Sequence, residues 1–423
     1  MKKILKTWTG LVLLDIVQAD LPVHCPIEKV VGAWNIKSVG VVESTNQLFQ
    51  QHSDTSASTF DFTIDLNNIY RPTQAGPTRE ALDLPFKIDS IPDGASSGTW
   101  SMIYDAGFVV QLEFSEYSLI FYGSFVYYPD PDFHGNPTPW VLPSGGTPGY
   151  ISDCSTITKG WVLKRTGTLT RTQHFTASLL EGAALGLSPV TVGRIRSLNS
   201  AFPLAYAPEE YLPVGVPKYT KQGDCGSCFV LSFAHAFEAT WYKQTKARIS
   251  IDREAILACS YSSQGCNGGY YQSLILDLLV TGIPLSGCMD MDENQFSAKT
   301  KIAQTCDLSC FENSLVYPSG FVELQTQARI QHWLLNVGPV PVALNLPAHL
   351  PGGIVPVNNE VKGTWSYVSH AVVLVGWGET SKGERYWEVY NPWGGDSARI
   401  RISRSESDGI LEHYAIGIKA SIH

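Results

Sequence analysis

A cysteine in a glycine- and serine-rich turn, followed at once by an apolar run, is the feature that most constrains this chain. The turn reads Gln222-Gly223-Asp224-Cys225-Gly226-Ser227-Cys228, and the run continues as Phe-Val-Leu-Ser-Phe-Ala-His-Ala-Phe to residue 237. The apolar run predicts a buried helix that begins at Cys228. A helix N-terminus carries partial positive charge and stabilises a thiolate there. The pattern therefore indicates a nucleophilic cysteine.

Two downstream segments supply the partners that such a cysteine needs. His370 lies 142 residues after Cys228, and Asn391 follows in Asn-Pro-Trp-Gly. An imidazole takes the thiol proton and later protonates the leaving amine, so His370 is the predicted base. Asn391 would orient that ring, and Gln222 would donate its amide to the developing oxyanion beside the Cys228 backbone N–H. Trp393 is the predicted supporting residue next to Asn391.

Each of these residues also has a plainer interpretation. A lone cysteine in a Gly/Ser-rich turn is more often structural. Cys228, His370 and Asn391 in this order, each in its own context, favour catalysis instead. His235, on the same predicted helix as Cys228, fits a core or surface histidine better than a rival base. The ten histidines show no spacing such as His-x-x-x-His, so the sequence predicts no metal site.

These motifs resemble the papain family of cysteine proteases, over roughly residues 206–423. The segment Gly265-Cys266-Asn267-Gly268-Gly269 is similar to the family's G-C-x-G-G sequence. The resemblance implies a two-lobed catalytic domain, one lobe helical and one β, with Gly268 and Gly269 pairing with substrate backbone. Glycine permits that close approach, although the pair could also be a plain turn. Phe229 departs from the family's Trp or Tyr, and Pro392 from its Ser.

The N-terminal half has a different character. Residues 1–19 have a positive start, a short apolar core and a small final residue, which predicts a secretory signal peptide. An uncleaved anchor is the alternative. Aromatic and β-branched runs broken by Gly, Pro and Asp then predict antiparallel strands in a closed or sandwiched all-β domain over residues 20–164. Residues 165–205 are interpreted as a linker or a cleavable activation segment.

This half resembles the exclusion domain found in the dipeptide-releasing branch of the papain family. The residues that carry the likeness are Asp20, Cys25, Cys154 and Gly160-Trp161. The resemblance implies that Asp20, as the mature N-terminus, lies at the closed end of the substrate cleft. Its carboxylate would there bind the α-ammonium group of a substrate. A frayed, solvated terminus is the alternative.

Nine cysteines in a secreted chain leave one over after pairing, and a reactive thiol accounts for it. Sequence alone does not fix which cysteines pair. The resemblance implies the pairs Cys25–Cys154, Cys225–Cys266, Cys259–Cys306 and Cys288–Cys310, which leaves Cys228 free. Disulfides indicate the secretory pathway, with a lysosome-like vesicle or secretion as the destination.

The charge composition limits the classes of molecule that the chain could bind. A net charge of −9 without a basic cluster argues against nucleic acid and against an anionic membrane after signal cleavage. The chemistry requires no cofactor. The resemblance implies a chloride site built from two tyrosine hydroxyls. Tyr317 matches one of these tyrosines, but Gln272 stands where the other is expected, which argues against chloride binding here. An activating protease and a homo-oligomer are partners that the sequence leaves open.

The sequence therefore predicts an α+β chain, with an all-β domain followed by a papain-like domain. The activity that the resemblance implies is that of a cysteine exopeptidase which releases dipeptides from free N-termini of peptides or proteins. An endopeptidase whose β domain serves another purpose is the first alternative. An inactive homologue used as a binding module is the second.

Overall fold

The structure is a computed structural model, and its description covers most of the two predicted domains. The described residues are 25, 29–39, 60–70, 86–88, 91–103, 106–134, 149–166, 169–182, 202–208, 222–223, 225–260, 262–263, 265–289, 306–307, 309–312, 316–324, 326–344, 346–347, 350, 352–356, 361–362, 365–366, 368, 370–404 and 414–422. The predicted signal peptide and Asp20 lie outside these residues.

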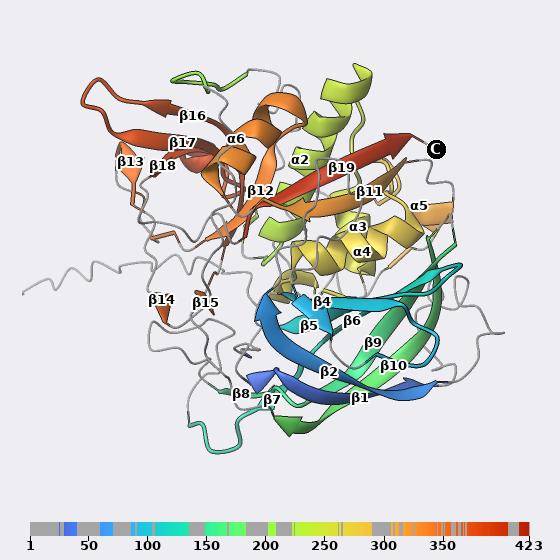
Figure 1. The fold of residues 1–423 in the computed structure, drawn as a ribbon. Coiled ribbons are helices and arrows are strands. Elements are labelled where there is room, and N and C mark those ends of the chain that lie inside the picture. Colours follow the sequence, from blue (N-terminus) through green and yellow to red (C-terminus); the bar gives the residue numbers. More distant parts are fainter. Residues whose placement is uncertain are drawn as a thin grey trace, which may run out of the picture.

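The N-terminal half forms a closed antiparallel barrel, drawn blue to green in Figure 1. Its strands follow the order β1-β10-β9-β6-β5-β4-β3-β2. Their bounds are β1 Gly32–Val39, β2 Asp61–Tyr70, β3 Phe86–Ile88, β4 Ser97–Ile103, β5 Gly107–Glu113, β6 Ser118–Ser124, β9 Thr156–Arg165 and β10 Leu169–Gly182. A hairpin of β7 (Val126–Pro129) and β8 (Tyr150–Asp153) is added outside it. Closure removes the free sheet edges that would otherwise invite aggregation.

Aromatic side chains fill the barrel. Trp34 and Phe108 meet edge to face with ring centroids 5.1 Å apart, and Phe121 and Phe175 do so at 5.6 Å. All four side chains are fully buried. Such pairs contribute about 0.5–1.5 kcal/mol each beyond the area they bury. The expectation of an all-β domain is confirmed, and of the closed and sandwiched arrangements it allowed, the closed one is observed.

The barrel extends further along the chain than the sequence predicted. Strand β10 lies between β1 and β9 and closes the barrel, so a domain end at 164 and a linker over 165–182 are wrong. The threonines and charged residues of β10 give it a composition that is also typical of a polar linker. Phe175 and Ala177 nevertheless alternate inward as a strand requires. At the other end of the proposed linker, Tyr206 exchanges two backbone hydrogen bonds with Trp377 of the catalytic half.

The catalytic half has a helical lobe and a β lobe, coloured yellow-green to red in Figure 1. The helical elements are α2 Cys228–Thr245, α3 Arg253–Cys259, η3 Gly265–Asn267, α4 Tyr271–Thr281 and α5 Ser309–Glu312. The five-stranded sheet runs β12-β16-β17-β18-β13, with bounds β12 Val340–Leu344, β13 Ile354–Val355, β16 His370–Glu379, β17 Arg385–Tyr390 and β18 Arg399–Ser403. The remaining elements are β11 Val316–Glu323 paired with β19 Ile416–Ile422, β14 Val361–Lys362 paired with β15 Trp365–Ser366, α6 Gln327–Asn336 and η5 Gly395–Ser397.

Helix α2 passes through the centre of this half. Its residues are buried almost all round from Cys228 to Trp241, which explains why the sequence shows a continuous apolar run there. The helix ends at Lys246, whose backbone is left-handed with φ of 60°. The predicted helix that begins at Cys228 is confirmed and continues to Thr245.

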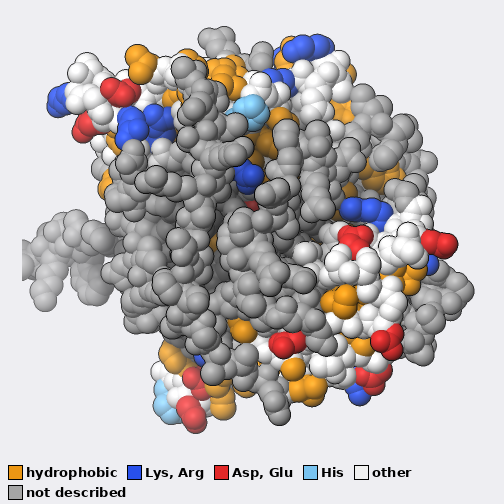
Figure 2. Space-filling model, viewed as in Figure 1, with side chains coloured by type: hydrophobic (Ala, Val, Ile, Leu, Met, Phe, Trp, Pro, Cys, Tyr) orange, Lys and Arg blue, Asp and Glu red, His pale blue; other side chains and the backbone are white. Residues whose placement is uncertain are grey.

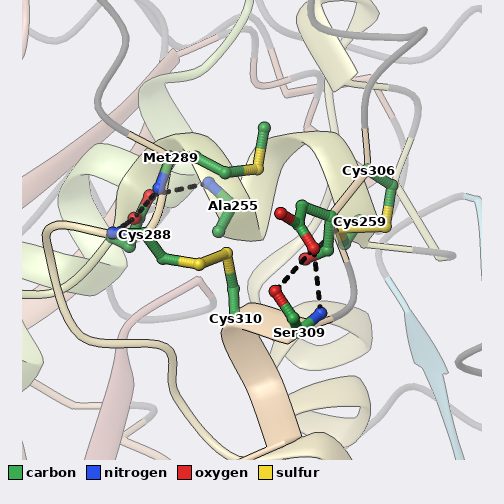
Figure 3. The surroundings of a disulfide bond; sticks show 9 residues. Ala255, Cys259, Cys288, Met289, Cys306, Ser309 and Cys310 are labelled. Carbon is green, nitrogen blue, oxygen red and sulfur yellow. Dashed lines mark hydrogen bonds between the residues drawn. A yellow bond between two sulfur atoms is a disulfide. The ribbon is translucent and has the colours of Figure 1, made fainter.

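Four disulfides form with the pairing that the resemblance implies: Cys25–Cys154 within the N-terminal half, and Cys225–Cys266, Cys259–Cys306 and Cys288–Cys310 within the catalytic half. Figure 3 shows the last two lying side by side near helix α3. Asp307 lies close to Cys288 and Cys310. Because those two sulfurs are bonded to each other, neither is a thiolate able to hold a metal.

Surface charge and helix length bear on whether nucleic acid or a membrane could be a partner. On the face in Figure 2, lysine and arginine side chains of described residues occur in small groups among acidic and neutral ones. Within the described ranges, no helix is both long and apolar enough to cross a membrane.

Candidate active site

Cys228 is the first residue of α2 and the one free cysteine among the nine; its side chain is buried. The turn before it is fixed from two sides. Cys225 is bonded to Cys266, and the Gly226 N–H donates to the Cys266 carbonyl over 2.8 Å. The covalent and hydrogen-bonded turn holds the sulfur of Cys228 at the N-terminal end of the helix.

His370 and Asn391 come from neighbouring strands of the β lobe. His370 opens β16 and Asn391 directly follows β17, its antiparallel partner, so the pairing brings the two side chains together. Nε2 of His370 lies 2.8 Å from Oδ1 of Asn391, and both residues are buried. With the amide oxygen as acceptor, Nε2 carries the hydrogen. Nδ1 is then left to accept a thiol proton.

Trp393 completes the surroundings of this pair. Its ring stacks on His370 with centroids 4.6 Å apart, and its backbone N–H donates to Asn391 Oδ1 over 3.3 Å. The stacked indole restricts the tilt of the imidazole and covers the hydrogen bond from water. This position agrees with the supporting role predicted for Trp393.

Burial controls the charge of the base. Desolvation lowers the pKa of His370 from 6.5 to about 4, and the hydrogen bond to Asn391 raises it in part. The imidazole is therefore neutral down to about pH 4 and can accept a proton. It becomes an imidazolium when it takes one from Cys228, because the new thiolate then supplies the opposite charge.

Gln222 is tied to the same loop as Asn391. Its backbone N–H donates to the Pro392 carbonyl over 2.9 Å, while its own carbonyl accepts from Cys225 N–H. The side chain is buried. The residue at 392 contributes a backbone oxygen, so the replacement of the family's serine by Pro392 leaves this anchor intact.

Two hydroxyl groups link the helical lobe to the β lobe close to the nucleophile, and no sequence motif singles out either residue. Ser232 of α2 donates to the carbonyl of Ala371, next to His370, over 3.0 Å. The Tyr271 hydroxyl lies 3.4 Å from the carbonyls of both Val342 and Val372. Burial, and secondarily the negative charge of Cys228, hold the Tyr271 pKa well above its usual value. These contacts fix the β16 end of the site relative to α2.

The predicted substrate-binding glycines have the conformation of a close-approach segment. Gly268 has φ of +123°, which favours glycine. A Cβ on Gly269 would lie 2.6 Å from the Phe229 ring and 2.7 Å from Ser263 Cβ, so no larger residue fits. Phe229 therefore packs beneath Gly269 although it departs from the family's Trp or Tyr.

His235, Gln272 and Tyr317 are the remaining predicted residues that the structure describes. His235 is buried and stacks on Tyr390 with centroids 4.2 Å apart, two helical turns, or about 10 Å, along α2 from Cys228. That position supports the structural interpretation of His235. Gln272 is buried on α4 and Tyr317 lies on β11.

A thiol at a helix N-terminus with a buried His–Asn pair is the kind of site used for acyl transfer to cysteine. Comparison with known families agrees. Residues 211–420 match the papain family of cysteine proteases, and residues 20–128 match the cathepsin C exclusion domain. The chain belongs to the papain family of cysteine proteases and carries a cathepsin C-type exclusion domain.

Individual relatives resemble the catalytic half. Cathepsin B-like CP1 of Giardia intestinalis is 26% identical over 54% of this chain and 78% of its own length. Procathepsin L of Mus musculus is 30% identical over 44% of this chain and 57% of its own, and cathepsin L1 of Drosophila melanogaster is 28% identical over 44% and 50%. The chain thus spans only about half the length of these cathepsin L relatives. A solved structure of digestive procathepsin L 3 from Tenebrio molitor has 22% identity and a TM-score of 0.43, over 53% of this chain and 72% of its own.

Iodoacetamide is expected to label Cys228 alone among the nine cysteines of the oxidised protein, because the other eight are paired. The labelling rate should fall as the pH is lowered through about 4, where His370 becomes protonated and no longer accepts the thiol proton. Peptide mapping of protein labelled at pH 6 and at pH 3.5 measures both effects. Label spread over several cysteines would contradict the assignment.

Proposed function

We propose that this chain is a cysteine exopeptidase that removes dipeptides from free N-termini of peptides and proteins. One observation carries the proposal. An exclusion-type barrel packs against the lobe that bears the glycine segment: the Tyr122 hydroxyl of the barrel donates to Asp277 of α4 over 2.9 Å. A barrel fixed there can close one end of the substrate path.

The reaction follows from the four side chains of the site. His370 Nδ1 takes the Cys228 proton, and the thiolate attacks the scissile carbonyl carbon. The Cys228 N–H and the Gln222 amide stabilise the oxyanion, which collapses to a thioester as His370 protonates the leaving amine. Water, deprotonated by His370, then releases the dipeptide acid and restores the thiol. Asn391 keeps the imidazole oriented through both steps.

Asp20 is proposed as the group that measures the dipeptide. The residue lies outside the described part of the chain, but the Cys25–Cys154 disulfide fixes the backbone five residues later to the barrel. A carboxylate near the closed end would accept hydrogen bonds from a substrate's α-ammonium group, which is cationic below a pKa of about 8. Gly268 and Gly269 would pair with the backbone of the same two residues.

Asp20→Ala, with cleavage after residue 19 retained, is expected to lower kcat/KM on dipeptide amides with free amines by about 5- to 150-fold. Asp20→Asn is the matched variant, since it keeps the shape and removes the charge. Substrates with free and N-acetylated amines are compared in each protein, and Cys228 alkylation checks that the nucleophile is unaffected. Equal cleavage of free and acetylated substrates by the wild type would favour an endopeptidase.

The endopeptidase remains the second candidate, because the cathepsin L and B relatives align with about half of this chain and so do not test the role of the barrel. An irreversible epoxide probe separates both enzymes from an inactive binding module. The setting we propose is the secretory pathway, ending in a lysosome-like vesicle or outside the cell, as the four disulfides favour.

A further inference from the structure

A buried carboxylate joins the barrel to the catalytic half. Asp277 lies in the middle of the apolar helix α4 and is 4% exposed. Its Oδ1 accepts from the Tyr122 hydroxyl over 2.9 Å. Its Oδ2 accepts from the Ser260 hydroxyl over 3.2 Å and from the Ser262 N–H and hydroxyl over 3.0 and 2.7 Å. One side chain thus binds groups from two domains.

On the barrel side, Tyr122 belongs to a row of outward-facing residues that are buried. Phe121 packs inside the barrel, so Tyr122, the next residue on β6, points outward. Trp161 of β9 is its register partner, and His174 of β10 is the partner of Trp161. The three outward residues are only 1%, 1% and 8% exposed. The row is therefore covered, and Tyr122 provides a hydrogen-bonded link from it to Asp277 of α4.

On the catalytic side, the serines bound by Asp277 begin the substrate-binding segment. Ser262 precedes η3 (Gly265–Asn267), and the Gly268-Gly269 pair follows it. Cys266 within η3 is bonded to Cys225, and its carbonyl holds the Gly226 N–H. A short path of contacts therefore runs from Tyr122 through Asp277 to the turn before Cys228.

A ligand-binding role for Asp277 is excluded by space. The cavity that it lines with Ser260, Leu274 and Thr281 has a volume of about 10 Å³, enough for one water molecule at most. Both carboxylate oxygens also have donors already. A carboxylate buried among apolar residues is costly unless it is fully hydrogen-bonded, so each donor it loses destabilises its position.

We infer that Asp277 is a positioning residue which couples docking of the barrel to the conformation of the segment 260–269. When the barrel is docked, Tyr122 completes the set of donors and Asp277 is held against Ser262. When that bond is lost, Oδ1 of Asp277 lacks the Tyr122 donor, which favours rotation of the carboxylate. Rotation would weaken its hydrogen bonds to Ser262. Docking of the barrel would then favour the shape of the segment that receives substrate. Only the effect on free-amine selectivity rests on the proposed exopeptidase function.

The test compares Tyr122→Phe and Asp277→Asn with Tyr128→Phe, a matched change at a half-exposed tyrosine of the β7–β8 hairpin, outside the barrel. Amide hydrogen exchange in residues 260–269 is measured on the full chain without substrate. Tyr122→Phe and Asp277→Asn are expected to speed amide exchange in residues 260–269 by about ten-fold or more. Tyr128→Phe is expected to leave that exchange unchanged. Cys228 alkylation should stay near the wild-type rate in all three, which shows that the nucleophile is intact.

Kinetics supply the second readout. KM for a free-amine dipeptide amide should rise about 2- to 30-fold in Tyr122→Phe, with little change in kcat. The rate of cleavage of the acetylated substrate should rise relative to that of the free-amine substrate. Unchanged exchange in residues 260–269 of Tyr122→Phe would overturn the coupling, and this variant decides alone if Asp277→Asn fails to fold. If the wild type cleaves acetylated substrates freely, the exopeptidase proposal fails while the exchange result still judges the coupling.

Discussion

His370→Ala is expected to lower kcat/KM on any peptide substrate by about 10⁴- to 10⁶-fold. The variant removes both the acceptor of the thiol proton and the donor to the leaving amine. Nε2 of the His370 ring is hydrogen-bonded to Asn391, whose side-chain amide cannot replace a base. Steady-state kinetics with a fluorogenic substrate, and titration of active sites with an epoxide inhibitor, measure the loss.

Two further variants make this result specific. Asn391→Ala should retain partial activity, about 10- to 100-fold below the wild type, because orientation is weakened while both reacting groups survive. His332→Ala changes an exposed histidine on α6 and should have no effect. Near-normal kcat in His370→Ala would show that the base is wrongly assigned, and His235 would then have to be tested despite its stacked position on Tyr390.

Much of the catalytic centre could be predicted from the sequence because each group lies in a local pattern. Cys228 begins an apolar helix, His370 begins a buried strand, and Asn391 directly follows the next strand, so strand pairing brings the last two together. The glycine segment is likewise predictable, because Gly268 and Gly269 are adjacent in the sequence Gly265-Cys266-Asn267-Gly268-Gly269. These features depend on residues close together in the chain.

Features that depend on distant contacts could not be predicted in the same way. The linker predicted over residues 165–205 contains the last barrel strand, β10, whose pairing with β1, some 140 residues earlier, decides its structure. Asp277 did carry a signal, as a lone carboxylate in the apolar helix Tyr271–Thr281. Its partner Tyr122 lies 155 residues away, and no local pattern connects them.

Gln222→Ala is expected to lower kcat by about 10²- to 10³-fold with little change in KM. A hydrogen bond from the Gln222 amide to the substrate's carbonyl oxygen strengthens as negative charge develops on that oxygen, so its loss affects the transition state more than the ground state. The structure favours a clean result, because the backbone of Gln222 is held by Pro392 and Cys225 whatever its side chain is. Single-turnover kinetics on an amide substrate measure the acylation step directly.

The matched variant for Gln222 is Gln222→Glu, which keeps the size and places an acceptor where the donor was. If the side-chain amide stabilises the oxyanion, Gln222→Glu should be no more active than Gln222→Ala at neutral pH, since a carboxylate repels the developing charge. Alkylation of Cys228 by iodoacetamide forms no oxyanion, so it should proceed at a near-normal rate in both. A large loss of alkylation as well as acylation would show instead that the residue supports the turn before Cys228, which its contacts with Cys225 and Pro392 would then explain.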